Sequence, residues 1–132
     1  MAKALHCSVI TPERQVFDAD ATSVVIPAHD GLVGILDGRA PLLCELGTGV
    51  LRVDAAGSGA RQFFVDGGFA QVLNNEVIVL SERAAAAEDI SRAEAAKALE
   101  AAEGMPARDE AATAARNRAI AGAKTRLKLA QK

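Results

Sequence analysis

The residues able to do acid–base or nucleophilic chemistry are few in this sequence and widely spaced. It has two histidines, His6 and His29, and neither lies in a His-x-x-x-His or Gly-x-Ser-x-Gly context. Cys7 and Cys44 are 37 positions apart and match no zinc-binding or Cys-x-x-Cys spacing. Carboxylates such as Asp66 are present, but nothing in the sequence pairs two of them as an acid and a base. We therefore expect no catalytic residue, no metal site and no autonomous enzyme.

The most distinctive stretch runs from Phe63 to Val72, Phe-Phe-Val-Asp-Gly-Gly-Phe-Ala-Gln-Val. Its β-branched and aromatic residues predict a strand, and the glycine pair predicts a kink or bulge where backbones approach closely. A phosphate-binding loop is the alternative, but that motif needs a longer glycine loop leading into a helix, often with a Lys-Ser/Thr pair. Neither feature is present, so we favour the strand.

Length and composition limit the class of protein. A chain of 132 residues has room for one domain, or for a small domain with an appendage. Half of the residues are hydrophobic, which argues against disorder throughout. The net charge of −2 and the pI of about 5.7 argue against nucleic-acid binding through bulk positive charge. Apolar runs are short, so we expect no signal peptide and no direct membrane insertion, and therefore a cytosolic location. Because the spacing of the two cysteines matches no zinc or Cys-x-x-Cys motif, we expect both to be reduced.

The first eighty residues alternate strand patterns with turn signals. Leu5 to Ile10 alternates apolar and polar residues, as a half-buried strand does. Tight hairpins are predicted at residues 55–59 and at Asn74-Asn75. No stretch before residue 81 has a helical pattern. We therefore predict an N-terminal antiparallel β-sandwich or flattened barrel over residues 1–83.

The composition changes abruptly at Ala84. The last 49 residues contain 19 alanines and no aromatic residue, and alanine has the highest helix propensity. Ser91 with Glu94 makes a capping box for a first helix. Gly104 ends that helix and a second one follows. The predicted fold class is α+β in the order β then α, with a C-terminal two-helix hairpin over residues 84–132.

The hairpin is expected to dock weakly and to carry a basic surface. Burying an alanine methyl group gains only about 0.8 kcal/mol, against roughly 1.5 to 3 kcal/mol for a leucine, so the hairpin can detach from the sandwich. After Glu110 the sequence has no acidic residue. The bases of the second helix predict contact with an acidic partner surface: Arg116, Arg118, Lys124, Arg126 and Lys128. The ordinary alternative is a solvated face whose charges suit the helix macrodipole.

Four motifs in the β half and one in the tail resemble the ε subunit of F-type ATP synthases. The β motifs are Thr-Pro-Glu-Arg-Gln-Val-Phe (11–17), Val-Val-Ile-Pro (24–27), Gly-Arg-Ala-Pro-Leu-Leu (38–43) and Phe-Val-Asp-Gly-Gly-Phe-Ala-Gln-Val (64–72). The tail motif is Arg-Leu-Lys-Leu-Ala (126–130). They stand in the family's order, and the change of composition falls in the right place.

This resemblance implies a non-catalytic part of a rotary motor. In the family, the β-domain at the foot of the central stalk contacts the γ subunit and the c-ring, and couples proton- or sodium-driven rotation to ATP synthesis. The helical tail is the regulator: compact, it permits turnover, and extended along γ into the α/β catalytic head, it obstructs ATP hydrolysis. The implied location is peripheral, on the cytoplasmic face of the bacterial plasma membrane.

Several positions depart from the family pattern. The family's usual Pro-Gly-His-Ala-Pro is Asp-Gly-Arg-Ala-Pro here (37–41), with Arg39 in place of the histidine. A position that is often acidic in the ring-facing loop is Leu32, which follows Asp30 and Gly31. The resemblance implies c-ring and γ contacts at Asp30, Gly31, Leu32 and Arg39.

A regulatory ATP site is also implied by the resemblance. Some bacterial members bind ATP on the folded tail through an Ile/Leu-Asp-x-x-Arg-Ala motif, of which this chain keeps Asp89, Arg92 and Ala93. Glu88 occupies the first position, and its carboxylate disfavours a triphosphate unless Arg126 on the facing helix offsets it. The alternative is that Asp89 and Arg92 only cap and stabilise the first tail helix. No other cofactor is expected.

Two other functions stay open from the sequence. One is a β-sandwich adaptor that recruits an acidic partner through its basic second helix, without γ or a ring. The other is a small hydrolase or ligand-binding enzyme hidden in the sandwich, which measurable turnover by the isolated chain would favour.

Overall fold

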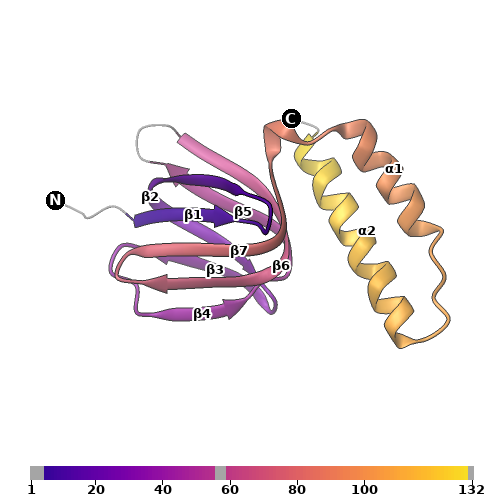
Figure 1. The fold of residues 1–132 in the computed structure, drawn as a ribbon, viewed down its shortest axis with the longest axis horizontal. Coiled ribbons are helices and arrows are strands. Elements are labelled where there is room, and N and C mark those ends of the chain that lie inside the picture. Colours follow the sequence, from indigo (N-terminus) through magenta and orange to yellow (C-terminus); the bar gives the residue numbers. More distant parts are fainter. Residues whose placement is uncertain (1–4, 56–58, 131–132) are drawn as a thin grey trace.

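The computed structural model describes residues 5–55 and 59–130 of the chain. In this part, strands form a sandwich and two helices lie beside it (Figure 1). The strands are β1 (Leu5–Ile10), β2 (Gln15–Ala28), β3 (Gly31–Leu36), β4 (Leu42–Glu45), β5 (Thr48–Ala55), β6 (Gly59–Leu73) and β7 (Glu76–Ala86). They are followed by a short 3₁₀ helix η1 (Ala87–Asp89), then α1 (Arg92–Glu103) and α2 (Glu110–Ala130).

The strands close on themselves into a flattened sandwich. The order is β1-β7-β6-β5-β2-β3, β1 also pairs with β2, and β4 pairs with β6. Among the described pairings only β1 and β7 run parallel; the others are antiparallel. The predicted fold class is confirmed, with one parallel pair that the sequence did not indicate.

Local signals in the sequence predicted two hairpins. Asn74 and Asn75 have φ of 51° and 62°, so they form the predicted tight hairpin between β6 and β7. The hairpin predicted at residues 55–59 is flanked by paired Ala55 and Gly59, while its tip, 56–58, lies outside the described residues.

The core is made by alternate side chains of the strands. Leu5, Cys7 and Val9 of β1 are fully buried, as their alternation predicted. Neither cysteine forms a disulfide, and burial raises the pKa of the Cys7 thiol to about 12. The thiolate form is therefore strongly disfavoured at this position.

The glycine pair in β6 turns the strand around a corner of the sandwich. Before the pair, Phe63 and Val65 point into the core, whereas after it Ala70 and Val72 do, so the inward-facing parity reverses. Gly68 has φ of 102°, and a methyl group there would lie 1.9 Å from the Leu80 carbonyl oxygen. The predicted kink and close backbone approach are confirmed. The pairing with β7 keeps its register through the pair, so there is no bulge on that side.

The prediction that helix begins at Ala84 is wrong. β7 continues to Ala86 because Ala84, Ala85 and Ala86 pair with residues 63–65 of β6, and sheet hydrogen bonding outweighs the helix propensity of alanine. Helix α1 begins at Arg92, with Ser91 Oγ accepting from Glu94 N as the capping box predicted.

Helix α2 packs against β5 and β6, and α1 packs against α2 (Figure 1). Asp109 caps α2, since its Oδ1 accepts from Ala112 N at 2.7 Å. In the part of the chain that the structure describes, no helix is both long and apolar enough to cross a bilayer.

Candidate functional site

The surface on which α2 docks is built from small residues and one aromatic ring. Gly122 and Ala123 are buried, and a methyl group added at Gly122 would lie 3.5 Å from the Phe64 ring. Phe64 is buried but lies outside the core cluster, on the side of β6 that α2 covers. Close packing of glycine and alanine gains little hydrophobic free energy. The polar contacts at this surface therefore contribute a larger share of the docking free energy than they would beside large apolar side chains.

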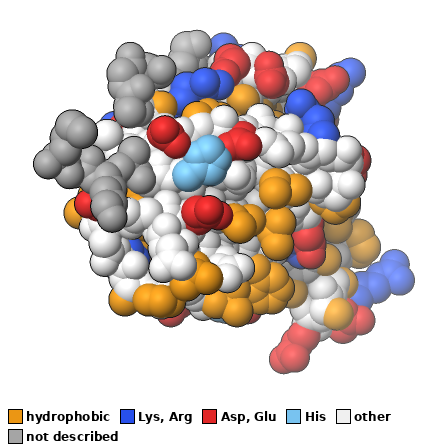
Figure 2. Space-filling model, turned by 60° about the vertical axis from the view of Figure 1, so that its left-hand side comes forward, with side chains coloured by type: hydrophobic (Ala, Val, Ile, Leu, Met, Phe, Trp, Pro, Cys, Tyr) orange, Lys and Arg blue, Asp and Glu red, His pale blue; other side chains and the backbone are white. Residues whose placement is uncertain are grey.

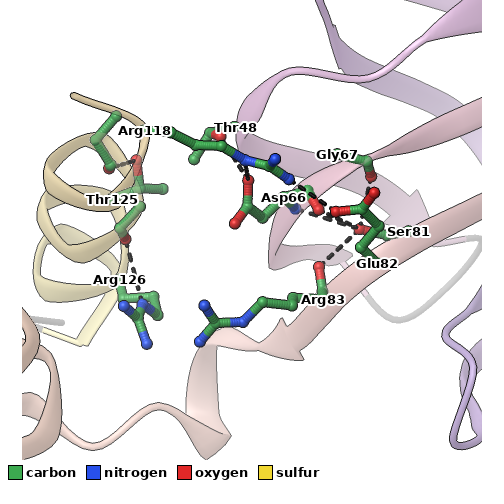
Figure 3. A network of polar contacts seen from close by, with 11 residues as sticks. Thr48, Asp66, Gly67, Ser81, Glu82, Arg83, Arg118, Thr125 and Arg126 are labelled. Carbon is green, nitrogen blue, oxygen red and sulfur yellow. Dashed lines mark hydrogen bonds and ion pairs between the residues drawn. The ribbon is translucent and has the colours of Figure 1, made fainter. Parts of the chain in front are cut away.

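One arginine of α2 bridges two strands (Figure 3). Arg118 Nε donates to Asp66 Oδ1 at 2.9 Å, and Arg118 Nη2 donates to Glu82 Oε2 at 2.9 Å. Thr48 Oγ1 donates to the same Asp66 oxygen at 2.7 Å. The Asp66 side chain is only 10% exposed, so this pair is less screened by water than a surface ion pair. The hydrogen bonds with Asp66 and then Glu82 raise the pKa of Arg118.

A second arginine of α2 lies in the opposite electrostatic environment. Arg126 stacks on the Phe64 ring, with 5.3 Å from its Cζ to the ring centroid, and Arg83 reaches toward it from β7 (Figure 3). Burial lowers the pKa of Arg126, and the charge of Arg83 lowers it further. Within the described residues, neither guanidinium forms an ion pair. An anion between them would stabilise both charges.

A cavity of about 330 Å³ opens beside these two arginines. Phe64 and Asp66 of β6 and Arg83 of β7 form one wall, and alanine-rich faces of α1 and α2 form the other. The cavity therefore combines apolar walls with guanidinium groups and with the Asp66 carboxylate, which is paired with Arg118. The guanidinium groups of Arg83 and Arg126 suit an anion.

The predicted ATP-binding residues are only partly brought together. Arg126 lines the cavity, whereas Asp89, Arg92 and Ala93 do not. These three residues are exposed where η1 leads into α1, and η1 packs against α2. The sequence did not indicate Arg83, because its place beside Arg126 depends on β7 continuing past residue 83.

The five basic residues of α2 are divided by docking. Arg118 and Arg126 face the sandwich, and Arg116 Nη2 donates to the Glu103 carbonyl oxygen at 3.2 Å. Lys124 and Lys128 are exposed. Their predicted contact with an acidic partner stays a prediction, and three of the five (Arg116, Arg118 and Arg126) make contacts within the chain in this state.

The predicted ring and γ contacts lie at the two ends of β3. Asp30 lies in the tight connection from β2 to β3, Gly31 and Leu32 begin β3, and Leu32 is 74% exposed. Arg39 follows the other end of β3, and its Nη1 donates to the Gly34 carbonyl oxygen at 3.4 Å. All four residues are exposed, and what they contact stays a prediction.

An exposed apolar surface on β4, β6 and β7 was not predicted. Leu43, Phe69 and Leu80 are 51–70% exposed, and Phe69 pairs with Leu80 across the strands. We call these three residues the outer apolar face; Figure 2 shows apolar side chains gathered on this side of the sandwich. The alternation of buried and exposed residues did not reveal it, because both faces of these strands carry apolar side chains. Apolar surface of this kind commonly marks a protein interface.

His6 of β1 lies among acidic side chains of the neighbouring strands. Its Nδ1 is 2.9 Å from Asp20 Oδ1, its Nε2 contacts Asp18, and Glu76 is its neighbour on β7. The hydrogen bond with Asp20 raises the pKa of His6 above its ordinary value of 6.5, and the charge of Asp18 adds to the effect. Among the described residues, no group of three or more histidine, cysteine or carboxylate side chains is placed to hold a metal ion.

His6 is expected to make stability depend on pH. Because its pKa is raised in the folded state, its stabilising contribution is complete below about pH 6.5 and is lost as the pH rises through the raised value. We expect His6→Gln to lower the free energy of unfolding in urea at acidic pH and to have little effect at alkaline pH. His29→Gln, in an exposed turn, is the control. A difference between His6→Gln and the unmodified chain that is the same at every pH would contradict this assignment.

Comparison with known proteins identifies the family of the β-sandwich. Residues 4–87 match a family model described as the ATP synthase delta/epsilon chain β-sandwich domain. The sandwich therefore defines the class as a delta/epsilon-type chain of ATP synthase.

Relatives with similar sequences identify the family within this class. The ATP synthase epsilon chain of Rhodopirellula baltica is 45% identical over 78% of this chain and 80% of its own length. That of a Synechococcus species is 50% identical over 72% of this chain and 68% of its own length. The chain belongs to the ATP synthase epsilon-chain family.

Solved structures support the fold over almost the whole chain. A chain in the Euglena gracilis mitochondrial ATP synthase structure has a TM-score of 0.81 at 24% identity, covering 98% of this chain and 82% of that one. A chain in the Tetrahymena thermophila central stalk and c-ring structure has a TM-score of 0.73 at 13% identity, covering 98% of both. Sandwich and hairpin are thus matched together.

Proposed function

We propose that the chain is the non-catalytic central-stalk subunit of a rotary ATP synthase, which couples rotation of the c-ring to ATP synthesis. The observation that carries this proposal is the family membership, with 45% identity to an epsilon chain over most of both sequences. The driving ion in this proposal is a proton or sodium, and the location is the cytoplasmic face of a bacterial plasma membrane.

Each partner is assigned to one surface in this proposal. The outer apolar face suits γ, because exposed apolar surface gains most free energy from a permanent partner. The exposed turn with Asp30 and Leu32 suits the polar loops of the c-ring, and Arg39 a nearby stalk contact. The basic residues of α2 suit acidic loops of the catalytic head.

The hairpin is the proposed regulator, docked in one state and extended into the catalytic head in another. The docked hairpin is held by few large side chains, which supports a small free-energy difference between the two states. In the extended state Arg118 and Arg126 become available to the head.

A truncation tests the regulatory role. We expect the full chain to suppress ATP hydrolysis by the matching soluble catalytic head and a chain ending at Ala87 to bind equally but not suppress it. The truncation is placed there because β7 pairs with β6 up to Ala86. Equal hydrolysis with both versions would reject an inhibitory tail, and binding by neither would reject the rotor assignment in favour of the adaptor.

Charge reversal can then locate the contact with the head. Arg116, Lys124 and Lys128 are the residues to reverse, because Arg118 and Arg126 also hold the docked state. Such reversal is expected to weaken suppression without changing docking.

We also propose that the cavity beside Arg83 and Arg126 binds the phosphate groups of regulatory ATP. What supports this is the pair of neighbouring guanidiniums without a carboxylate partner among the described residues, next to apolar walls. Asp89, Arg92 and Ala93, which lie where η1 leads into α1, remain candidate ATP-binding residues in this proposal. Arg126 and Arg83 would hold phosphate oxygens, and Phe64 and the alanine faces would exclude water from them.

Calorimetry of the full chain with ATP tests this site. We expect Arg126→Gln to weaken binding roughly tenfold or more, because a charged hydrogen bond contributes about 1.5–3 kcal/mol. Lys128→Gln makes the same change of charge on the exposed face of α2 and is the control. No heat of binding with the unmodified chain, or an equal loss in both variants, would reject the site.

A further inference from the structure

Two carboxylates and a glycine form a seat for one guanidinium on the side of the sandwich. Asp66 and Gly67 belong to β6, and Glu82 on β7 lies next to Gly67. Both carboxylates point to the same place, where Arg118 of α2 lies (Figure 3). The seat opens onto a cavity of about 510 Å³ that Gly67, Glu82 and Arg118 line, so solvent reaches it.

The buried part of this seat is held in place before any guanidinium arrives. Thr48 Oγ1 donates to Asp66 Oδ1, and Ser81 Oγ accepts from Asp66 N at 3.2 Å. The Ser81 hydroxyl also lies 3.0 Å from the Gly67 carbonyl oxygen and 2.7 Å from that of Arg83. Little rearrangement is therefore needed when Asp66 accepts a hydrogen bond from an arginine.

Gly67 leaves the space that the guanidinium occupies. Its φ is 75°, and a methyl group at this position would lie 2.6 Å from Arg118 Nη2 and 3.1 Å from Glu82 Oε2. No backbone atom outside its neighbours is that close, so the cost of the methyl group falls on the ion pair and on the φ angle. The first glycine of the pair thus serves the contact with α2, and the second, Gly68, serves the kink.

We propose that the segment Asp66-Gly67, with Glu82, is a guanidinium receptor whose occupant is Arg118, and that filling it is what holds the helical hairpin docked. Arg118 makes the ion pairs between α2 and the strands among the described residues, whereas Arg126 contacts the sandwich through the Phe64 ring. This inference rests on the proposed function in one respect, that the hairpin leaves the sandwich.

Hydrogen–deuterium exchange of the full chain tests the receptor without any partner. We expect Arg118→Gln to speed exchange in α2 roughly tenfold or more, because hydrogen bonds to two charged groups are lost. Exchange in β1, β2 and β3, which α2 does not cover, serves as the internal control. Lys124→Gln makes the same change of charge on the exposed face of α2 and should leave exchange unchanged. Arg118→Lys, which keeps the charge but loses the forked geometry, should give an intermediate rate.

A double variant keeps the test decisive if unpaired Asp66 unfolds the sandwich. Arg118→Gln with Asp66→Asn removes both charges, and α2 should still exchange fast while the sandwich stays protected. Unchanged exchange of α2 in these variants, or equal acceleration by Lys124→Gln, would overturn the receptor. Faster exchange of α2 with unaltered suppression of ATP hydrolysis would instead support the receptor and reject the tail as an inhibitor.

Discussion

Gly68→Ala is expected to destabilise the sandwich by roughly 3–5 kcal/mol, enough to unfold a domain of ordinary stability. The methyl group would lie 1.9 Å from the Leu80 carbonyl oxygen, which is backbone and cannot rotate away. The φ of 102° adds strain for any residue with a side chain. Because the glycine pair reverses which side chains of β6 face the core, a shift here misplaces the strand on both sides.

Variants at two other glycines distinguish the steric clash from the backbone strain as causes of the lost stability. Gly31 has φ of 141° but open space around it, so Gly31→Ala should cost only the strain of about 1–3 kcal/mol. Gly34 has neither constraint, so Gly34→Ala should change stability by less than about 0.5 kcal/mol. Urea denaturation of the three variants measures the order. Equal effects of Gly68→Ala and Gly31→Ala would show that the close approach to Leu80 is unimportant.

Phe63→Ala is expected to lower the free energy of unfolding by about 3–5 kcal/mol, and Phe64→Ala to act mainly on the hairpin. Phe63 is fully buried in the core, with its ring centroid 5.0 Å from that of Phe17. Phe64, the next residue, faces α2, where Arg126 stacks on its ring and the ring lies beside Gly122. Adjacent strand residues point to opposite faces, so the two rings stabilise different parts of the molecule.

Comparing the full chain with the chain ending at Ala87 measures the different roles of Phe63 and Phe64. Phe63→Ala should cost the same in the full and the truncated chain, because its contacts lie inside the sandwich. Phe64→Ala should cost less in the truncated chain, because the helix that covers the ring is gone. A loss that is identical in both chains for Phe64→Ala would mean that the ring supports the sandwich and not the docked hairpin.

The sequence by itself determined the elements whose signals are local. The capping box at Ser91, the Asn74-Asn75 hairpin and the alternation in β1 depend on neighbours a few positions apart, and the structure has all three. Their physics is short-range: caps satisfy free amides, asparagine tolerates positive φ, and alternation follows the pleat. The fold class followed from these signals and from the alanine content.

Only the tertiary structure decided where the strand ended and which charges met. Ala84 to Ala86 form strand because β6 supplies hydrogen-bond partners, which outweighs their helix propensity. Arg118 and Asp66 are 52 positions apart, and their pairing depends on the angle at which α2 docks. Long-range contacts of this kind leave no local trace in the sequence. The guanidinium seat, the Arg83–Arg126 pair and the outer apolar face therefore became visible only when the strands were placed side by side.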